Sequence, residues 1–178
     1  MTAADVSPHV GHATQPARAA SSRLPALGRK GEGWVALQVA LAAAAVGAGI
    51  VGPQWPPAAS AWLAAAGGLA ALSGAVLLVG GGASLGRQLT PFPKPVAEGS
   101  LRNGGVYRLV RHPMYGGALL AMLGWALVSS PLALVPLGLA AAFLEAKRRR
   151  EEAWLLEQHP DYAEYQRRVH RRFIPFAW

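Results

Sequence analysis

Two long apolar runs in the first half of the chain predict membrane-spanning helices. Residues 34–51 contain one polar side chain, that of Gln38, and residues 58–85 contain no charged residue. At a rise of 1.5 Å per residue, the first run makes a helix of about 27 Å, close to the thickness of the hydrocarbon core of a bilayer. Prolines between the runs end the first helix, because proline is incompatible with a helix interior. We therefore expect one span over each run.

Two shorter apolar runs, over 114–128 and 132–144, predict a hairpin of two further helices. Each run is short for a span, but helical composition continues from the second run through the charged stretch 145–152 to about Gln158. The pattern favours helices over about 113–129 and 131–158, the second projecting from the membrane, over a pair of re-entrant segments. A short amphipathic helix over about 160–170 is expected to cap the cytoplasmic face.

Composition supports a membrane protein. Of the 178 residues, 52% are hydrophobic and 15% are charged, whereas soluble domains have about 25% charged residues. The chain has no cysteine, which excludes a disulfide framework, a thiolate zinc site and a cysteine nucleophile. The predicted fold class is an all-α integral membrane protein with four transmembrane helices.

The position of the basic residues predicts the orientation. With four spans, the 17 Lys and Arg residues divide into four in the N-terminal tail, five in 86–113 and eight from Lys147 onward, all on one side. The positive-inside rule places that side in the cytoplasm, with both termini. The same distribution accounts for the net charge of +8 without nucleic acid. We expect a bacterial plasma membrane protein whose functional site faces the cytoplasm.

The chain divides into a tail and one domain. Residues 1–33 have no apolar period and predict a disordered basic tail, followed by a single domain over 34–178. A cleaved signal peptide over 34–60 is the alternative, although 33 preceding residues are long for its charged region.

Glycines in 58–85 and 113–129 predict close helix packing, as in Gly82-x-x-x-Gly86, within a tight bundle rather than a dimer.

Polar residues concentrate on the predicted cytoplasmic side. Pro113 suits the first turn of a helix, and the free N–H groups there, beside Arg111 and His112, predict an anion site. The alternative is that these two residues anchor the helix at the headgroups. On the last long helix, Lys147 and Glu151 share a face, while residues 148–150 indicate a solvated surface. The adjacent carboxylates at 151 and 152 repel each other and would be relieved by a cationic ligand.

The order and spacing of these residues resemble one family. The chain is similar to isoprenylcysteine carboxyl methyltransferases and, more distantly, to phospholipid N-methyltransferases. The resemblance rests on Gly105-x-Tyr107-x-x-x-Arg111-His112-Pro113-x-Tyr115-x-Gly117, Glu151-Glu152, Tyr162-x-x-Tyr165-x-x-Arg168-Val169 and Phe173-Ile174-Pro175. It implies transfer of a methyl group from S-adenosylmethionine to a lipophilic acceptor in the membrane, with carboxyl O-methylation favoured. No G-x-G-x-x-G motif follows a predicted strand, in agreement with that family.

The resemblance also implies roles for individual residues. The cofactor-binding residues would be Leu101, Tyr107, His112, Pro113, Tyr115, Glu151 and Glu152. Lys147 would take the position of the family's substrate-binding basic residue, usually Arg, and Arg111 is a second candidate for substrate binding. A carboxylate acceptor needs no base, whereas an amine or thiol would require His112 or Tyr115 as proton acceptor. Neither a covalent nucleophile nor a metal is expected.

Two other classes remain open from the sequence. A membrane sterol-type reductase would bind NADPH, although the paired glutamates disfavour a phosphate-rich cofactor. A small four-helix transporter or scaffold is the non-enzymatic alternative, but it should place ionisable residues at the membrane midplane, and the first three predicted helices have none. The expected partners are a lipophilic acceptor and membrane lipids. The acceptor's identity, the methylated atom and the oligomeric state stay open.

Overall fold

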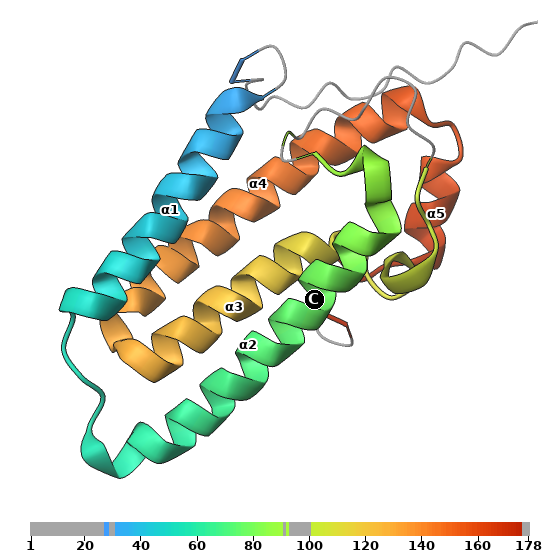
Figure 1. Ribbon diagram of the computed structural model, residues 1–178. Helices are drawn as coiled ribbons and strands as arrows, with labels where there is room; N and C mark the ends of the chain where they lie inside the picture. The colour runs from blue at the N-terminus through green and yellow to red at the C-terminus, as the bar shows by residue number, and fades with distance from the viewer. Residues whose placement is uncertain (1–26, 29–30, 91, 93–100, 176–178) are drawn as a thin grey trace, which may run out of the picture.

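The computed structural model describes residues 27–28, 31–90, 92 and 101–175, and these residues form helices without a β-strand (Figure 1). The helices are α1 (Glu32–Val51), α2 (Pro57–Leu85), α3 (Pro113–Ser129), α4 (Leu134–Gln158) and α5 (Tyr162–Arg168). Short 3-10 helices η1 (Gly86–Gln88), η2 (Gly105–Arg108) and η3 (Pro131–Ala133) connect them. The predicted all-α class is confirmed over this part of the chain. Most of the predicted tail over 1–33 lies outside the described residues.

Local sequence explains where the helices begin. Pro57 and Pro113 occupy first-turn positions of α2 and α3, where a missing N–H breaks no helical hydrogen bond. Between α3 and α4, the Ser130 hydroxyl accepts a hydrogen bond from the Leu132 N–H at 3.1 Å. This bond caps η3, which leads into α4.

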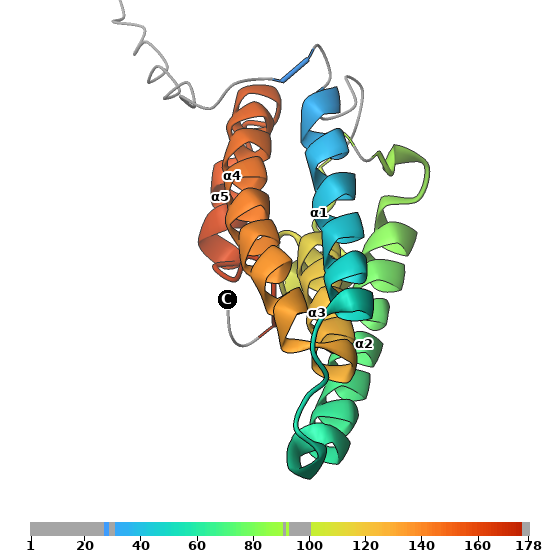
Figure 2. The same ribbon diagram turned by 90° about the vertical axis from the view of Figure 1, so that its left-hand side faces the viewer.

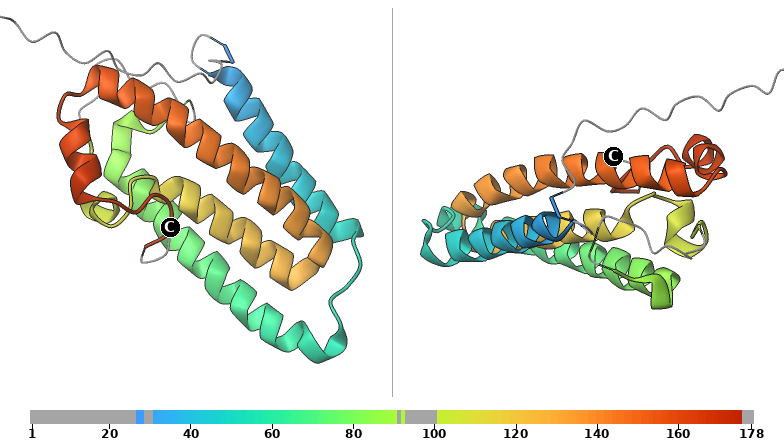
Figure 3. Two further views of the ribbon diagram at one scale, coloured as in Figure 1. Left: turned by 180° about the vertical axis from the view of Figure 1, so that it is seen from behind. Right: turned by 90° about the horizontal axis from the view of Figure 1, so that it is seen from above.

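The four long helices form two layers. Helices α1, α3 and α2 lie side by side in one layer, and α4 with α5 covers one face of it (Figures 2 and 3). Helix α3 contacts α1, α2 and α4. It is therefore the central helix of the bundle, and its N-terminal end carries the residues from Pro113 to Gly117 that the sequence singled out.

Glycines bring the backbones of α2 and α3 into direct contact. A Cβ atom on Gly74 would lie 2.7 Å from the Gly117 carbonyl oxygen, and one on Gly124 would lie 2.6 Å from the Gly67 carbonyl oxygen. These glycines recur every seventh residue, so they lie on one stripe of each helix. The pair Gly82-x-x-x-Gly86 does not pack in this way, because Leu89, at 3.9 Å, is the only described residue that a Cβ on Gly82 would meet.

Two of the helices are long and apolar enough to cross a membrane. They cover Glu32–Val51 and Pro57–Gln88, whereas the apolar helix Pro113–Ser129 is shorter. Large apolar side chains project from them, including Ile50, which is 68% exposed, and Trp62, which is 80% exposed. Such surface is costly in water but suits contact with lipid. The prediction of four spans stays a prediction, as does the orientation.

The loops gather at opposite ends of the bundle. At one end Trp55, between α1 and α2, donates a hydrogen bond from Nε1 to the Ala126 carbonyl oxygen at 3.0 Å, near the end of α3. At the other end lie the start of α1, the end of α2 and helix α5 (Figure 1). The polar segments that the sequence singled out meet at this second end.

Candidate active site

A cavity of about 450 Å³ lies where all five α-helices and η2 converge. This volume is within the range of small-molecule sites in proteins. Of the residues predicted to form the site, the cavity wall includes Leu101, Tyr107, Arg111, His112, Tyr115, Lys147 and Glu151, but not Pro113 or Glu152. The other described residues that line it are Gln38, Leu78, Leu85, Gln88, Leu89, Thr90, Phe92, Arg102, Met114, Ala118, Leu155, His159, Tyr162 and Tyr165.

The segment before α3 is held in place by the C-terminal part of the chain. The Arg111 N–H donates to the Arg171 carbonyl oxygen at 3.0 Å, and the His112 N–H donates to the Arg172 carbonyl oxygen at 2.8 Å. Phe173 is fully buried, and its carbonyl lies against Gly116, where a Cβ atom would have no room. These backbone contacts fix the position of the His112 side chain at the cavity wall.

Helix geometry gives the two adjacent glutamates different environments. Successive residues of an α-helix point about 100° apart, and residues four apart share a face. Lys147, Glu151 and Leu155 therefore form one stripe of α4, and all three line the cavity. Arg148 and Glu152 form another stripe, which lies away from the cavity wall.

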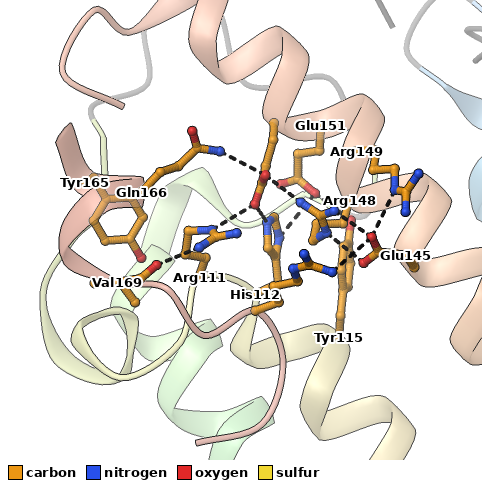
Figure 4. Close-up of polar contacts among 12 residues, drawn as sticks. Arg111, His112, Tyr115, Glu145, Arg148, Arg149, Glu151, Tyr165, Gln166 and Val169 are labelled. Carbon is orange, nitrogen blue, oxygen red and sulfur yellow. Dashed lines mark hydrogen bonds and ion pairs between the residues drawn. The ribbon is translucent and has the colours of Figure 1, made fainter. Parts of the chain in front are cut away.

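Glu152 is the centre of a buried ion-pair network. Figure 4 labels its partners Arg111, His112 and Arg148. Its Oε1 accepts a hydrogen bond from Arg111 Nε at 3.0 Å, and it lies 2.9 Å from His112 Nε2. Its Oε2 accepts from Arg148 at 2.6 Å and from Gln166 at 2.9 Å. Both carboxylate oxygens thus bind protein groups. Glu152 joins the start of α3 to α4 and α5.

Neighbouring cations keep this carboxylate ionised. Burial by itself would raise the pKa of Glu152, but the bond to His112 and the charges of Arg148 and Arg111 outweigh burial and lower the pKa from 4.5 to about 2. Glu145 belongs to the same network and pairs with Arg148 at 2.6 Å. Its pKa also falls to about 2, because hydrogen bonds from Arg148 and Arg149 outweigh the effect of burial.

Glu151, in contrast, faces the cavity. The Tyr115 hydroxyl donates to Glu151 Oε2 at 2.6 Å, and His112 Nδ1 lies 3.8 Å from the same oxygen. The Glu151 side chain is 26% exposed, so part of it remains accessible. A carboxylate in this position is able to meet a cationic or hydroxyl group of a ligand.

Aromatic rings form much of the wall around Glu151. Tyr107, Tyr115, Tyr162, Tyr165 and Phe92 all line the cavity. Burial raises the pKa values of Tyr107, Tyr162 and Tyr165 well above the usual value of a phenol, so their hydroxyls stay protonated at neutral pH. Ring faces and a carboxylate together favour a cation, because both present negative potential.

Lys147 lies deep in the same wall. Its residue surface is 1% exposed, and its Nζ lies 5.3 Å from the centre of the Tyr115 ring. Nζ donates to Gln38 Oε1 on α1 at 2.6 Å. Burial lowers the pKa of Lys147, while the charge of Glu151 opposes that effect. The cavity thus combines an ammonium group and a carboxylate within a largely aromatic and aliphatic wall.

The structure corrects part of the sequence reading. The solvated surface predicted for residues 148–150 is wrong for Arg148, which is buried and paired with Glu145 and Glu152. Arg111 lines the cavity, but its guanidinium donates to Glu152 and to the carbonyl oxygens of Val169 and His170. The contribution of Gln38 to the site was not predicted. The available signal was its position as the single polar residue in an apolar run.

Comparison with known families agrees with a membrane methyltransferase. Residues 62–161 match the family model described as "Phospholipid methyltransferase", which is more than half of the chain. The chain therefore belongs to the phospholipid methyltransferase family, which includes the isoprenylcysteine carboxyl methyltransferases. The family resemblance predicted from the motifs is confirmed. The matched range begins within α2 and ends before α5. No curated protein and no solved structure matches the chain.

Proposed function

We propose that this protein is an integral membrane methyltransferase that uses S-adenosylmethionine and modifies a lipophilic acceptor, with O-methylation of a carboxylate favoured. The observation that carries the proposal is the cavity itself, in which Glu151, aromatic rings and the buried Lys147 converge at one end of an apolar helix bundle. Methyltransferases of this family generally use S-adenosylmethionine. When bound, this cofactor supplies an electrophilic methyl group on a sulfonium cation.

The residues around Glu151 fit such a cofactor. A sulfonium is attracted to aromatic faces, which Tyr107 and Tyr115 provide, and Glu151 is positioned to bind an amino or hydroxyl group of the same ligand. Leu101 adds apolar surface, and His112 lies at the wall between the two carboxylates. In this proposal Pro113, Arg111 and Glu152 act on the cofactor site indirectly, by holding the start of α3 and α4 together.

The remaining wall suits an apolar acceptor. Leu78, Leu85, Met114 and Ala118 line the cavity on the side of α2 and α3, and Lys147 supplies a charge for the carboxylate of an isoprenoid acid or a similar molecule. Holding the acceptor and the methyl donor at attack distance in a dry site supplies most of the rate enhancement for a displacement of this kind. With an amine or thiol acceptor instead, His112 or Tyr115 would take the proton.

We further propose that α1, α2, α3 and the apolar part of the η3–α4 segment, as far as Leu144, each cross a bacterial plasma membrane. Both termini and residues 86–113 would lie in the cytoplasm. Support comes from the basic residues, all 17 of which fall outside the apolar segments and on the same side of a four-span arrangement. The cofactor would then reach the cavity from the cytoplasm, and the acceptor would reach it from the bilayer. Membrane lipids are the expected surroundings.

Calorimetric titration of the detergent-solubilised protein tests the enzyme class. S-adenosylhomocysteine, the demethylated cofactor, is expected to bind with a measurable heat, and NADPH is expected to give none. Methyl transfer from labelled S-adenosylmethionine to a panel of isoprenoid acids, thiols and lipid amines then identifies the acceptor class. Binding of NADPH without binding of S-adenosylhomocysteine would overturn the proposal in favour of a reductase.

A further inference from the structure

Gln38 brings α1 into a site whose other polar residues come from η1 and from the second half of the chain. It lies outside the range matched by the family model, yet its side chain lines the cavity and its Oε1 accepts a hydrogen bond from Lys147 Nζ at 2.6 Å. One turn earlier on α1, Trp34 is buried and its ring lies 5.4 Å from that of Phe143 on α4. This ring contact fixes α1 against α4 beside the Gln38–Lys147 bond.

The amide of Gln38 has donors that this bond does not use. A glutamine amide has one acceptor oxygen and an amino group with two N–H donors. The oxygen is bonded to Lys147, whereas Nε2 makes no hydrogen bond to any described residue. The cavity wall therefore presents an ammonium group and an amide amino group next to each other.

This pairing matters because a lysine by itself holds a carboxylate poorly. An ammonium is a compact point charge, whereas a guanidinium binds both oxygens of a carboxylate through two parallel N–H groups. A second donor beside the ammonium restores the missing hydrogen bond. We propose that Gln38 and Lys147 together form a carboxylate-binding subsite, in which Lys147 supplies the charge and Gln38 Nε2 supplies the second donor. The inference rests on the proposed function, and it specifies the acceptor as a carboxylic acid.

A merely structural role for Gln38 makes a different prediction. If Gln38 only positions Lys147, the isosteric change Gln38→Glu should keep Lys147 in place, because a carboxylate accepts from an ammonium at least as well as an amide does. The added charge should then weaken binding of an acid only as much as the same change at Gln88 does. If Gln38 binds the acceptor, Gln38→Glu removes the donor and introduces a like charge beside the carboxylate. The same variant therefore separates the two roles.

The experiment measures binding of two probes that differ in the head group. Farnesoic acid and the uncharged alcohol farnesol are titrated against the full-length protein in detergent, with Gln38→Glu, Lys147→Ala and Gln88→Glu in parallel. Gln88→Glu is the matched control, because Gln88 also lines the cavity and accepts a hydrogen bond from a cation, Arg102, at 3.4 Å. Thermal unfolding of each variant verifies its fold, and binding of S-adenosylhomocysteine is measured separately.

We expect the parent protein to prefer the acid over the alcohol by about tenfold or more, as the loss of one charged hydrogen bond implies. Gln38→Glu and Lys147→Ala should abolish the preference while alcohol binding stays within about twofold, and Gln88→Glu should keep most of it. No preference in the parent, an intact preference in Gln38→Glu, or an equal loss in Gln88→Glu would overturn the subsite. Failure to bind S-adenosylhomocysteine would instead refute the methyltransferase proposal, whatever the probes show.

Discussion

Glu151 and Glu152 are chain neighbours with separate tasks, because one faces the cavity and the other is enclosed by Arg111, His112 and Arg148. An ionised carboxylate buried in this way is stable only while its partners remain, and removing one member of such a network exposes the uncompensated charge of the others. The ionised form of a partly accessible carboxylate, such as that of Glu151, does not depend on protein partners in this way. The two residues should therefore respond differently to the same substitution.

The change from Glu to Gln tests this division. Glu151→Gln should weaken binding of S-adenosylhomocysteine by about 1–3 kcal/mol, the usual effect of losing a charged hydrogen-bond partner, and should leave the thermal unfolding temperature almost unchanged. Glu152→Gln should lower the free energy of unfolding by about 3 kcal/mol, since its cationic partners lose their anion. Calorimetry and thermal unfolding of both variants provide the measurements. Equal losses of stability in the two variants would contradict the division.

Helix α2 packs against α3 through glycines, and this interface depends on the absence of side chains. Gly74 meets the backbone of Gly117, which cannot move aside as a flexible side chain could. Gly68, only six positions earlier, has open space around it, because a Cβ atom added there would have no neighbour within 4 Å among the described residues. The two glycines thus share a helix but differ in the space available to them.

Substitution by alanine should have opposite effects at these positions. Gly68→Ala should stabilise the protein slightly, because alanine favours a helix by up to about 1 kcal/mol over glycine. Gly74→Ala should destabilise it by about 1–3 kcal/mol, the usual effect of overpacking. Unfolding by a denaturing detergent, followed by circular dichroism, compares both variants with the parent. Stabilisation by Gly74→Ala would show that α2 and α3 are less closely packed than these distances indicate.

The helices were more predictable than the contacts between them. Apolar runs end at prolines or charges, and both signals are local, so α2 and α3 begin where Pro57 and Pro113 stand. Seven of the residues that line the cavity followed from motif spacing. The choice between Glu151 and Glu152 did not, because it depends on how α4 is rotated against α3. Backbone contacts such as that of Phe173 with Gly116 join distant segments through atoms that every residue has, so they leave little trace in the sequence.

The molecule as a whole separates its polar site from the opposite end of the bundle. The cavity lies beside the start of α1, the end of α2 and α5, whereas Trp55 marks the other end through its bond to Ala126. If the apolar helices cross the bilayer, these two ends lie on opposite sides of the membrane. Trp55 is also a suitable residue for a membrane interface, where tryptophan is enriched.

Reporter fusions test this topology. A reporter inserted at Gln54 should be active only outside the cytoplasm, whereas one fused after Trp178 should be active in the cytoplasm, because basic flanking segments are retained on that side. Paired reporters that are active in opposite compartments, such as alkaline phosphatase and green fluorescent protein, provide the measurement and control for expression. Cytoplasmic activity at Gln54 would refute the four-span arrangement.

The two stripes of α4 have a consequence for how the family can diverge. Lys147, Glu151 and Leu155 face the cavity only because a fixed number of residues separates them from the turn at η3. Substitutions among the exposed apolar residues of α4, such as Val135 and Leu139, leave that number unchanged. A one-residue insertion or deletion there would rotate everything that follows by about 100°, removing Glu151 from the cavity and breaking the pairs of Glu152. Residue identity at these exposed positions of α4 can therefore vary, whereas the number of residues in this half of the helix cannot.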